Sequence, residues 1–278
     1  MALNVLSLGA GVQSTCVLLM SCHGLLPKLD HVIFADTGWE PKAVYDHLDW
    51  LKQEVQKFSL NIITVSAGNL KQDIIDHYDG KKKWLANPPL FTLDISGKKP
   101  KLGQMRRKCT SHFKVRPIER YIKRNILKIK RFCALPTKAI NLWMGISSDE
   151  VERLRDSLEH WKINYYPLVG IPVNFGFTFS RQNCLEWLNK TYPNIKPVKS
   201  ACLGCPFHSA AQWQETKQNE KEWLETCEVD DKIRHLPMMK NPTFLHRDRI
   251  PLRDINFDIQ IHKDDDPMND ECTGYCGN

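Results

Sequence analysis

The chain has 278 residues, of which 42% are hydrophobic, so it can form one large domain or a core domain with an appendage. No apolar run is long enough to span a membrane and the first residues lack secretory character, so we expect a cytoplasmic protein with no membrane partner. The net charge is +7, and ten cysteines in such a chain favour metal binding or catalysis over disulfides.

A glycine-containing turn follows the first apolar segment of the chain. Residues 3–6 have the character of a buried strand and residues 16–20 that of a helix, and between them stands Ser7-Leu8-Gly9-Ala10-Gly11-Val12-Gln13-Ser14-Thr15. Small residues let the backbone close around a phosphate, and the first N–H groups of the helix then face the negative charge. The hydroxyls of Ser14 and Thr15 add donors. The pattern favours a phosphate site, with an ordinary tight strand-to-helix turn as the alternative.

Strand-like and helix-like segments continue to alternate after this turn. Further strands are predicted over residues 30–35, 60–65 and 139–144, and helices over residues 41–57, 69–78 and 114–130. Asn69 is a suitable cap for the second of these helices. The order is typical of an α/β fold with a Rossmann-like parallel sheet flanked by helices.

The middle of the chain is strongly basic. Residues 81–131 hold 17 Lys and Arg against two acids, a balance of 17 − 2 = +15, which leaves 7 − 15 = −8 for the rest. The segment 80–108 contains several prolines and glycines and is expected to be a loop with a hairpin. Trp84, Phe91 and Phe113 lie among the cations, and this mixture suits RNA or DNA, whose bases stack and whose phosphates pair. A solvated basic face is the alternative.

The alternation weakens in the second half. A helix is expected from Asp149 and an extended segment over residues 164–169. We divide the chain into a nucleotide-binding domain over residues 1–170, which includes the basic insertion 80–131, and a smaller C-terminal appendage over residues 171–278. Within the appendage, helices are predicted over residues 181–190 and from Ser209, with a cysteine loop at 200–205 between them.

Three polar segments follow predicted strands. They are the turn from Gly9 to Thr15, Asp36-Thr37-Gly38 and Gly145-Ile146-Ser147. Ligands of parallel sheets bind beyond the carboxyl ends of the strands, so all three could meet one nucleotide. Asp36 could hold Mg²⁺ or a ribose hydroxyl. An aspartate that caps a helix is the alternative for Asp36.

Three cysteines are candidates for a metal site. Cys202 and Cys205 stand two residues apart in a chelating turn, and Cys109 follows three basic residues whose charges favour the thiolate. Together they could hold a [4Fe–4S] cluster or zinc, and a redox pair without metal is the other possibility. A fourth ligand could be Cys272, Cys276 or Cys184, or could be absent.

The other cysteines are assigned to packing. Cys16, Cys22 and Cys133 lie in apolar stretches and Cys184 on the apolar side of its helix, so core positions are expected for all four. Cys227 lies on a helix that looks exposed, and it has no assigned role.

Six segments between residue 3 and about residue 210 resemble, in the same order, the phosphoadenosine phosphosulfate reductase-like branch of the PP-loop ATP pyrophosphatases. Gly9–Thr15 resembles the pyrophosphate loop S-G-G-x-D-S, and Asp36-Thr37-Gly38-Trp39 resembles a D-T-G segment. The others are Cys109-Thr110 with Lys114 and Pro117 (C-C-x-x-x-K-x-x-P), Gly145-Ile146-Ser147 with Arg153 (G-x-R…R), Tyr166-Pro167-Leu168 (N-P-L) and Cys202-Leu203-Gly204-Cys205 (C-x-x-C).

The resemblance implies an adenine nucleotide alpha hydrolase-like fold of the HUP type that binds ATP or an adenylyl-type nucleotide, with Mg²⁺ and an iron–sulfur cluster. The nucleotide would meet Ser7, Gly9, Ala10, Gly11, Gln13, Ser14, Thr15, Asp36, Thr37, Gly145, Ile146 and Arg153. Asp36 and Lys114 would take part in catalysis. Cys272, in a tail that partly resembles the E-C-G-L-H tail of the reductases, would be a nucleophile or a cluster ligand.

Several residues depart from the family pattern. Gln13 stands where the pyrophosphate loop usually has Asp, Lys108 where iron–sulfur reductases have a cysteine, and Ser147 where Arg is usual. The tail lacks the histidine and ends in a second cysteine, Cys276. These departures weigh against sulfonucleotide reduction.

Three functions follow from these observations. The leading hypothesis is a PP-loop sulfur transferase that adenylates an oxygen of its substrate, releases pyrophosphate and inserts sulfur from the cluster, a cysteine or a donor protein. The basic stretch favours RNA or DNA as that substrate. The alternatives are a reductase of adenylyl sulfate or its 3′-phosphorylated form, and a non-catalytic nucleic-acid-binding module with zinc.

Overall fold

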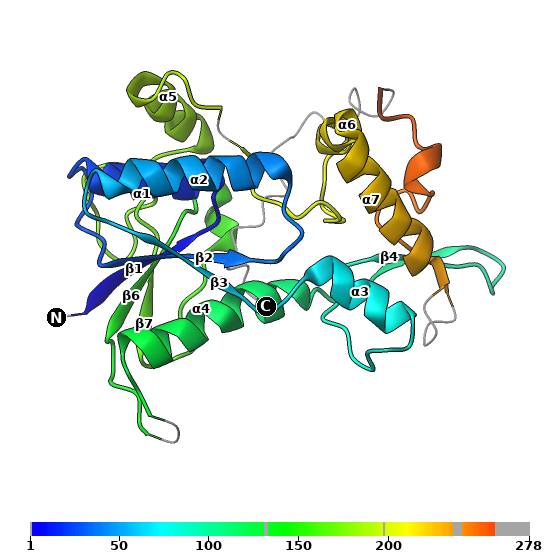
Figure 1. The fold of residues 1–278 in the computed structure, drawn as a ribbon, viewed down its shortest axis with the longest axis horizontal. Helices are drawn as coiled ribbons and strands as arrows, with labels where there is room; N and C mark the ends of the chain where they lie inside the picture. Colours follow the sequence, from blue (N-terminus) through cyan, green and yellow to red (C-terminus); the bar gives the residue numbers. More distant parts are fainter. Residues whose placement is uncertain (1, 131–132, 197, 236–240, 259–278) are drawn as a thin grey trace.

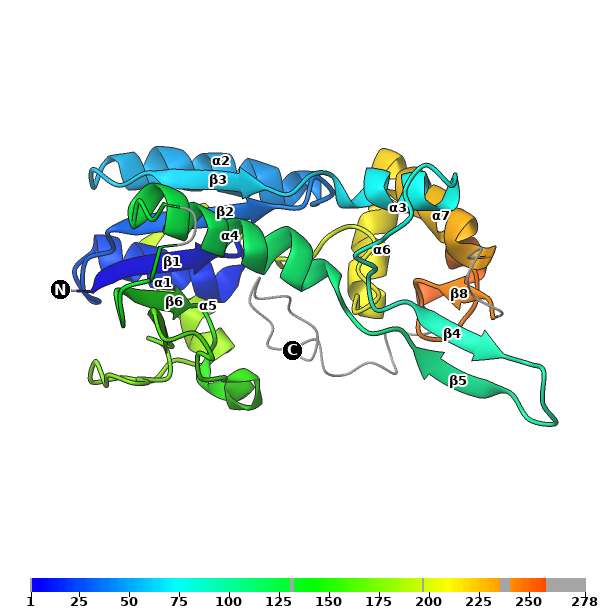
Figure 2. The ribbon, with the colours of Figure 1, turned by 90° about the horizontal axis from the view of Figure 1, so that it is seen from below.

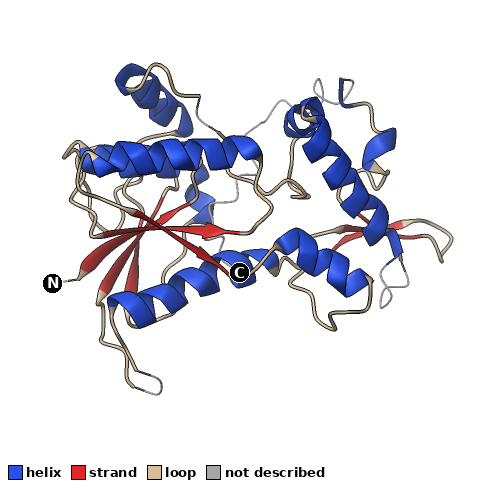
Figure 3. Ribbon diagram, in the orientation of Figure 1, coloured by secondary structure: helices blue, strands red, loops and turns tan. Residues whose placement is uncertain are grey.

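The computed structural model describes residues 2–130, 133–196, 198–235 and 241–258. One part of the molecule is built on a five-stranded parallel sheet in the strand order β3-β2-β1-β6-β7. Its strands are among those drawn in red in Figure 3. The strands are β1 (Leu3–Leu8), β2 (His31–Asp36), β3 (Ile62–Ser66), β6 (Ile140–Met144) and β7 (Lys162–Tyr165). The order reverses between β1 and β6, so their carboxyl ends form the switch point where such sheets bind ligands. The predicted α/β fold with a parallel sheet is confirmed.

Helices cover both faces of this sheet, which gives three layers (Figure 1). One face carries α1 (Val12–Cys22), α2 (Lys42–Gln56) and α5 (Arg181–Thr191), and the other carries α4 (Arg116–Tyr121) with the flanking helical turns η1 (Thr110–Val115) and η2 (Ile122–Ile126). Successive side chains of a strand point to opposite faces. Leu6 accordingly packs with α1, whereas Val5 packs with Ile118.

A second group of elements lies beside the parallel sheet (Figure 2). It comprises α3 (Leu70–Tyr78), α6 (Ala210–Gln218), α7 (Glu220–Lys232) and an antiparallel sheet of β5 (Lys101–Gln104), β4 (Phe91–Asp94) and β8 (Thr243–Phe244). Phe113, Trp213 and Cys227 are fully buried in its core. Short helical turns η3 (Ser148–Arg153), η4 (Ile233–His235) and η5 (Leu252–Asp254) complete the described elements.

The two groups draw on distant parts of the chain. Cys184 and Leu188 of α5 pack with α1 in the core of the parallel sheet. Leu70, Leu90 and Phe113 pack instead with residues between 203 and 257. The apolar cores therefore do not separate at residue 170, and the basic insertion contributes to both of them.

Most predicted elements occur where the sequence places them. The hairpin within residues 80–108 is β4 and β5, and the Asn69 side chain accepts a hydrogen bond from the Gln72 N–H at 2.9 Å as the cap of α3. The helix expected from Asp149 is only a short 3₁₀ segment, Ser148–Arg153. It is kinked at Glu150, which has φ −127° and whose side chain accepts a hydrogen bond from Gln13 of α1.

Two cysteine assignments are also wrong. Cys133 is exposed, and Cys227, on the side of α7 that faces the second core, is buried. Cys16 and Cys184 are buried as expected, and Cys22 is half-buried. In the described ranges, no helix combines the length and the apolar character needed to cross a membrane.

Candidate functional site

The turn between β1 and α1 folds tightly on itself. Ala10 has a φ of 57°, a left-handed conformation that is uncommon outside glycine. The Ser14 hydroxyl accepts a hydrogen bond from the Gly9 N–H at 3.2 Å and donates one to the Gly11 carbonyl at 3.3 Å. The first turn of α1 has no acidic residue, and none of the described side chains caps the helix. The positive end of the helix dipole is therefore not neutralised locally.

Ser200 covers this turn. Its hydroxyl donates a hydrogen bond to the Gly9 carbonyl, and its Cβ would lie 3.0 Å from a Cβ added at Gly11. The predicted nucleotide-binding residues of the turn are buried, namely Ser7, Gly9, Ala10, Gly11, Gln13, Ser14 and Thr15. A phosphate can reach the turn only if Ser200 moves aside.

The end of β6 packs directly on the start of α1. A Cβ added at Gly145 would lie 2.5 Å from the backbone nitrogen of Ser14, so only glycine fits there. Ile146 follows and is fully buried. The structure thus brings two of the predicted nucleotide segments together at the switch point of the sheet.

Gln13 belongs to a buried polar network. Its Nε2 donates to Glu150 Oε2 at 3.1 Å and to Ser147 Oγ at 3.4 Å. Arg153 pairs with Oε1 of the same carboxylate. An aspartate at position 13 could not donate to Glu150, which gives a physical reason for Gln13. The sequence did not point to Glu150.

Asp36 stands at the end of β2. Its Oδ1 accepts hydrogen bonds from the Gly38 N–H at 2.7 Å and from the Tyr45 hydroxyl at 2.9 Å. Burial, and then the bond to Asp36, raises the pKa of Tyr45 well above its usual value. Gly38 has a φ of 69°, and its carbonyl accepts from Asn69 Nδ2 at 2.7 Å. In this arrangement Asp36 fixes the turn after β2.

The three candidate metal ligands share one small cavity. Cys109, Cys202 and Cys205 line a volume of about 30 Å³ together with Lys114 and Thr37. Cys109 precedes η1, whereas the other two come from the loop between α5 and α6, and Thr37 directly follows β2. The predicted catalytic Lys114 and the predicted ligands of the described chain therefore lie together.

A buried carboxylate that sequence reasoning missed joins these groups. Glu40 Oε1 accepts hydrogen bonds from the Thr37 hydroxyl at 2.9 Å and the Cys202 thiol at 3.4 Å, and it lies 3.6 Å from Lys114 Nζ. The side chains of Glu40 and Lys114 are 1% and 6% exposed. Glu40 Oε2 has no hydrogen-bond partner among the described residues. Glu40 precedes α2 by two residues, where an acidic residue is usually read as a helix-start charge.

The cysteine loop is held from two sides. The Leu203 N–H donates to the Trp39 carbonyl at 3.0 Å, and a Cβ added at Gly204 would lie 2.0 Å from the Trp39 ring. On the other side the buried His208 hydrogen-bonds to the backbone of Cys202 and meets the Trp213 ring at 4.5 Å. Burial lowers the pKa of His208 to about 3, so its ring is neutral.

The donor types at the small cavity fit a thiolate-bound metal centre, because zinc and iron–sulfur clusters both take cysteine ligands. No three His, Cys, Asp or Glu side chains within the described ranges are already spaced to hold a metal ion. The Cys202 thiol donates to Glu40 Oε1. Cys272, predicted as a ligand and as a nucleophile, lies outside the described residues, as does Cys276.

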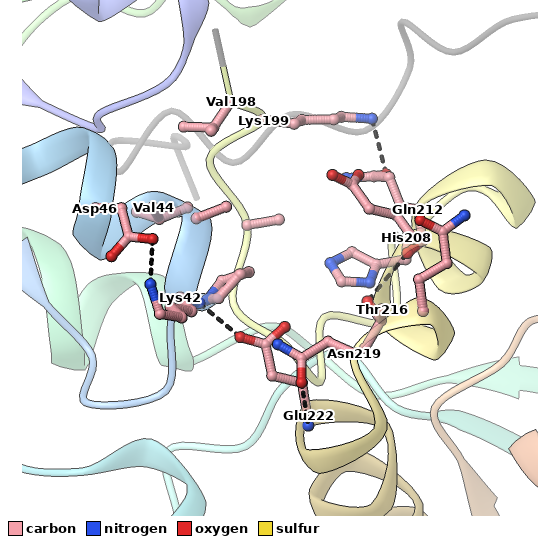
Figure 4. A pocket seen from close by; sticks show the side chains of 15 residues that line it. Lys42, Val44, Asp46, Val198, Lys199, His208, Gln212, Thr216, Asn219 and Glu222 are labelled. Atoms are coloured by element: carbon pink, nitrogen blue, oxygen red, sulfur yellow. Dashed lines mark hydrogen bonds and ion pairs between the residues drawn. The ribbon is translucent and has the colours of Figure 1, made fainter. Parts of the chain in front are cut away.

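A larger cavity of about 370 Å³ lies beside the segment 198–201, between the start of α2 and α6 (Figure 4). Val198, Lys199 and Ala201 line it on one side and His208 on another. Lys199 Nζ donates to Gln212 Oε1 at 2.9 Å across its rim. This space leaves room for the segment 198–201, which includes Ser200, to move off the glycine turn.

Comparison of the sequence with protein-family models gives no match, and comparison with curated proteins gives none either. The predicted site residues form two clusters. The first contains the glycine turn, Gly145 and Ile146, and Arg153 is linked to it by the ion pair with Glu150, which bonds to Gln13. The other contains the three thiols, Thr37 and Lys114, and the segment from Ser200 to Cys202 joins the two.

Proposed function

We propose that this chain is an ATP-dependent sulfur transferase of the PP-loop type, with an adenine nucleotide alpha hydrolase-like domain. One observation carries the proposal. The thiols of Cys109, Cys202 and Cys205 line one cavity beside Lys114, and Ser200, two residues before Cys202, lies on the glycine turn at the switch point. A nucleotide on the turn and a sulfur atom at the thiols would be neighbours.

The nucleotide would bind where the helix dipole faces it. With Ser200 displaced, the first N–H groups of α1 would face the phosphates, and Thr37 and Ile146 would flank the adenosine. Asp36 remains the candidate ligand for Mg²⁺, because the Gln13 amide is engaged with Glu150. Arg153 would not contact the nucleotide directly but would hold Glu150, with which it forms an ion pair.

The proposed reaction has two displacements. A substrate oxygen attacks the α-phosphorus of ATP, the bond to the bridging oxygen breaks, and pyrophosphate leaves with that electron pair. Sulfide supplied by a sulfur-donor protein then attacks the activated carbon, the carbon–oxygen bond breaks, and AMP leaves with the oxygen. Lys114 would stabilise the negative charge that develops on the transferring phosphoryl group.

A [4Fe–4S] cluster held by Cys109, Cys202 and Cys205 would leave one iron open to bind sulfur, whereas Cys272 as a fourth ligand would close that position. The three described thiols support it by their shared cavity. The substrate would be RNA or DNA, because residues 81–131 carry 17 Lys and Arg against two acids, a net charge of +15.

The test is metal content together with ATP cleavage, on anaerobically purified full-length protein. We expect about four irons and as many acid-labile sulfides per chain. We also expect pyrophosphate release from ATP when bulk RNA or DNA is present. Cys202→Ala should lose both, whereas Cys133→Ala, at an exposed position outside the cavity, should keep both.

Two results would count against the proposal. A chain with neither iron nor sulfide and no pyrophosphate release would overturn it. One zinc per chain, without labile sulfide and without ATP cleavage, would favour the nucleic-acid-binding module instead.

A further inference from the structure

A basic cavity of about 720 Å³ lies next to the thiol cavity. Four of the twelve described residues that line it are cationic, and none of the twelve is acidic: Arg106, Arg107, Lys108 and Arg116 supply the charge. Arg106, Lys108 and Arg116 are exposed to solvent. A volume of this size suits a small ligand, and the charge requires that ligand to be anionic.

Aromatic rings line the same cavity. The Trp84 indole is 47% exposed, although it is among the largest apolar side chains, and its edge meets His112 at 5.1 Å between ring centroids. On another wall the Arg107 guanidinium lies 5.4 Å from the centroid of the Phe207 ring. The exposed Trp84 indole beside these cations is suited to a flat ring attached to phosphate.

The basic cavity and the thiol cavity have a common border. Pro89, Arg107 and Thr110 line both of them. A ligand that fills the basic cavity would therefore end beside Arg107, where the thiol cavity begins.

The positive charge continues beyond the basic cavity. Gln104 and Met105 line it at the end of β5, and from there the β4–β5 hairpin extends away from the molecule (Figure 2). Lys98, Lys99 and Lys101 lie on that hairpin. A free nucleotide would not reach these lysines, whereas a strand of several nucleotides would.

We propose that the basic cavity binds one nucleotide of a single-stranded nucleic acid, with the base on Trp84 and the flanking phosphates on Arg106, Lys108 and Arg116. The strand continues along the β4–β5 hairpin. Its role as the sulfur acceptor rests on the proposed function, but its binding does not.

Fluorescence anisotropy with the full chain and a labelled single-stranded 12-nucleotide RNA, without ATP, tests the binding. Trp84→Ala should weaken affinity roughly 5- to 150-fold, the range for loss of one stacked base, and Trp84→Phe should restore most of it. Arg106→Ala, Lys108→Ala and Arg116→Ala should each weaken binding and lower the salt dependence by about one phosphate contact. Lys190→Ala, at an exposed position on α5, is the matched control for charge and should bind like the wild type.

Alternative ligands are tested as competitors of the labelled strand in the same assay. Free AMP and UMP, and a blunt 12-base-pair duplex, should compete at least tenfold less well than the strand. If the mononucleotides compete equally well, the ligand of the cavity is a free nucleotide and not a strand. If the duplex competes equally well, the cavity is only part of a general basic face. Unchanged binding in Trp84→Ala would also overturn the inference. Strand binding without pyrophosphate release would overturn the proposed function alone.

Discussion

Gln13 is the position where the glycine turn departs from the pyrophosphate loop it resembles, and its buried contacts give the reason. Its amide donates to Glu150 at 3.1 Å, and both side chains are nearly inaccessible to water. A carboxylate at position 13 would meet Glu150 with like charge in a poorly screened environment. The pair therefore needs one neutral donor and one acceptor.

Gln13→Glu should lower the free energy of unfolding by about 2 to 3 kcal/mol, because it removes a buried hydrogen bond to a charged group and adds a like charge. Adding Glu150→Gln should recover part of the loss by restoring one donor and one acceptor. Urea unfolding measures both, and Gln53→Glu, exposed on α2, should stay within about 0.5 kcal/mol of the wild type. A double variant no more stable than Gln13→Glu would contradict this account.

Individual residues differ in how far the sequence could place them. Cys202 and Cys205 are close in sequence, so their pairing could be predicted, and Cys109 was added to them because three basic residues precede it. Glu40 could not be found, because its partners Cys202 and Lys114 reach it only through the folded chain. Cys227 was misplaced because one helix alone does not show which face a distant partner covers.

At the scale of elements, Gly145, at the end of β6, lies closer to the backbone of another element, the start of α1, than any other described glycine of the candidate site does. A Cβ at Gly145 would lie 2.5 Å from the nitrogen and 2.6 Å from the Cα of Ser14. These are backbone atoms of a buried helix, so they cannot move as a side chain would. The two elements can meet at the switch point only through glycine.

Gly145→Ala should therefore destabilise the fold by about 1 to 3 kcal/mol or more and shift the start of α1. Because the phosphates would bind there, affinity for a non-hydrolysable ATP analogue should fall with it. Thermal unfolding and calorimetric titration give the two readouts. Gly97→Ala is the control, since an added Cβ there meets only the Lys99 carbonyl at 3.7 Å. Wild-type stability in Gly145→Ala would show that the contact is not fixed.

The parallel sheet could be predicted because each strand is a short buried run followed by a turn, and this signal is local. The hairpin and the helices α3 and α6 of the second group were predicted too, but their assembly could not be. It depends on β8, a strand of two residues that pairs with β4 from the other end of the chain, and on α3 packing against α7. Neither pairing has a local pattern.

For the whole molecule, the main question is whether the two groups of elements unfold together. Several segments pass between them, including η1, which bears Phe113 in the second core and leads into α4 on the parallel sheet. A substitution of His47 changes the pH dependence on the parallel-sheet side only. His47 lies in α2 on the parallel-sheet side, 3.0 Å from the Thr15 hydroxyl and stacked on Trp50, and burial lowers its pKa from 6.5 to about 4.

The sign of the pH effect follows from that shift. Above pH 6.5 the imidazole is neutral in both states, but below it the unfolded chain binds a proton that the folded chain excludes, so stability falls as the pH is lowered toward 4. Between pH 6.5 and 5 this amounts to about 1 to 2 kcal/mol, at up to about 1.4 kcal/mol per pH unit. His47→Gln should remove this part of the slope and keep the part that the buried His208 contributes, whose pKa is also lowered. His160→Gln, at an exposed position, should leave the slope unchanged.

Hydrogen exchange read by mass spectrometry at the two pH values reports each side of the molecule separately. The difference between wild type and His47→Gln isolates the His47 share of the loss, because the buried His208 contributes its own share in both proteins. If the segments between the groups couple them, this difference should be the same for amides of α1 and α7. If only the amides of α1 lose protection, the opening of α7 does not depend on the stability of the parallel-sheet side, and the second group unfolds independently. In that case the thiol cavity, which both groups line, would open without unfolding of the parallel sheet.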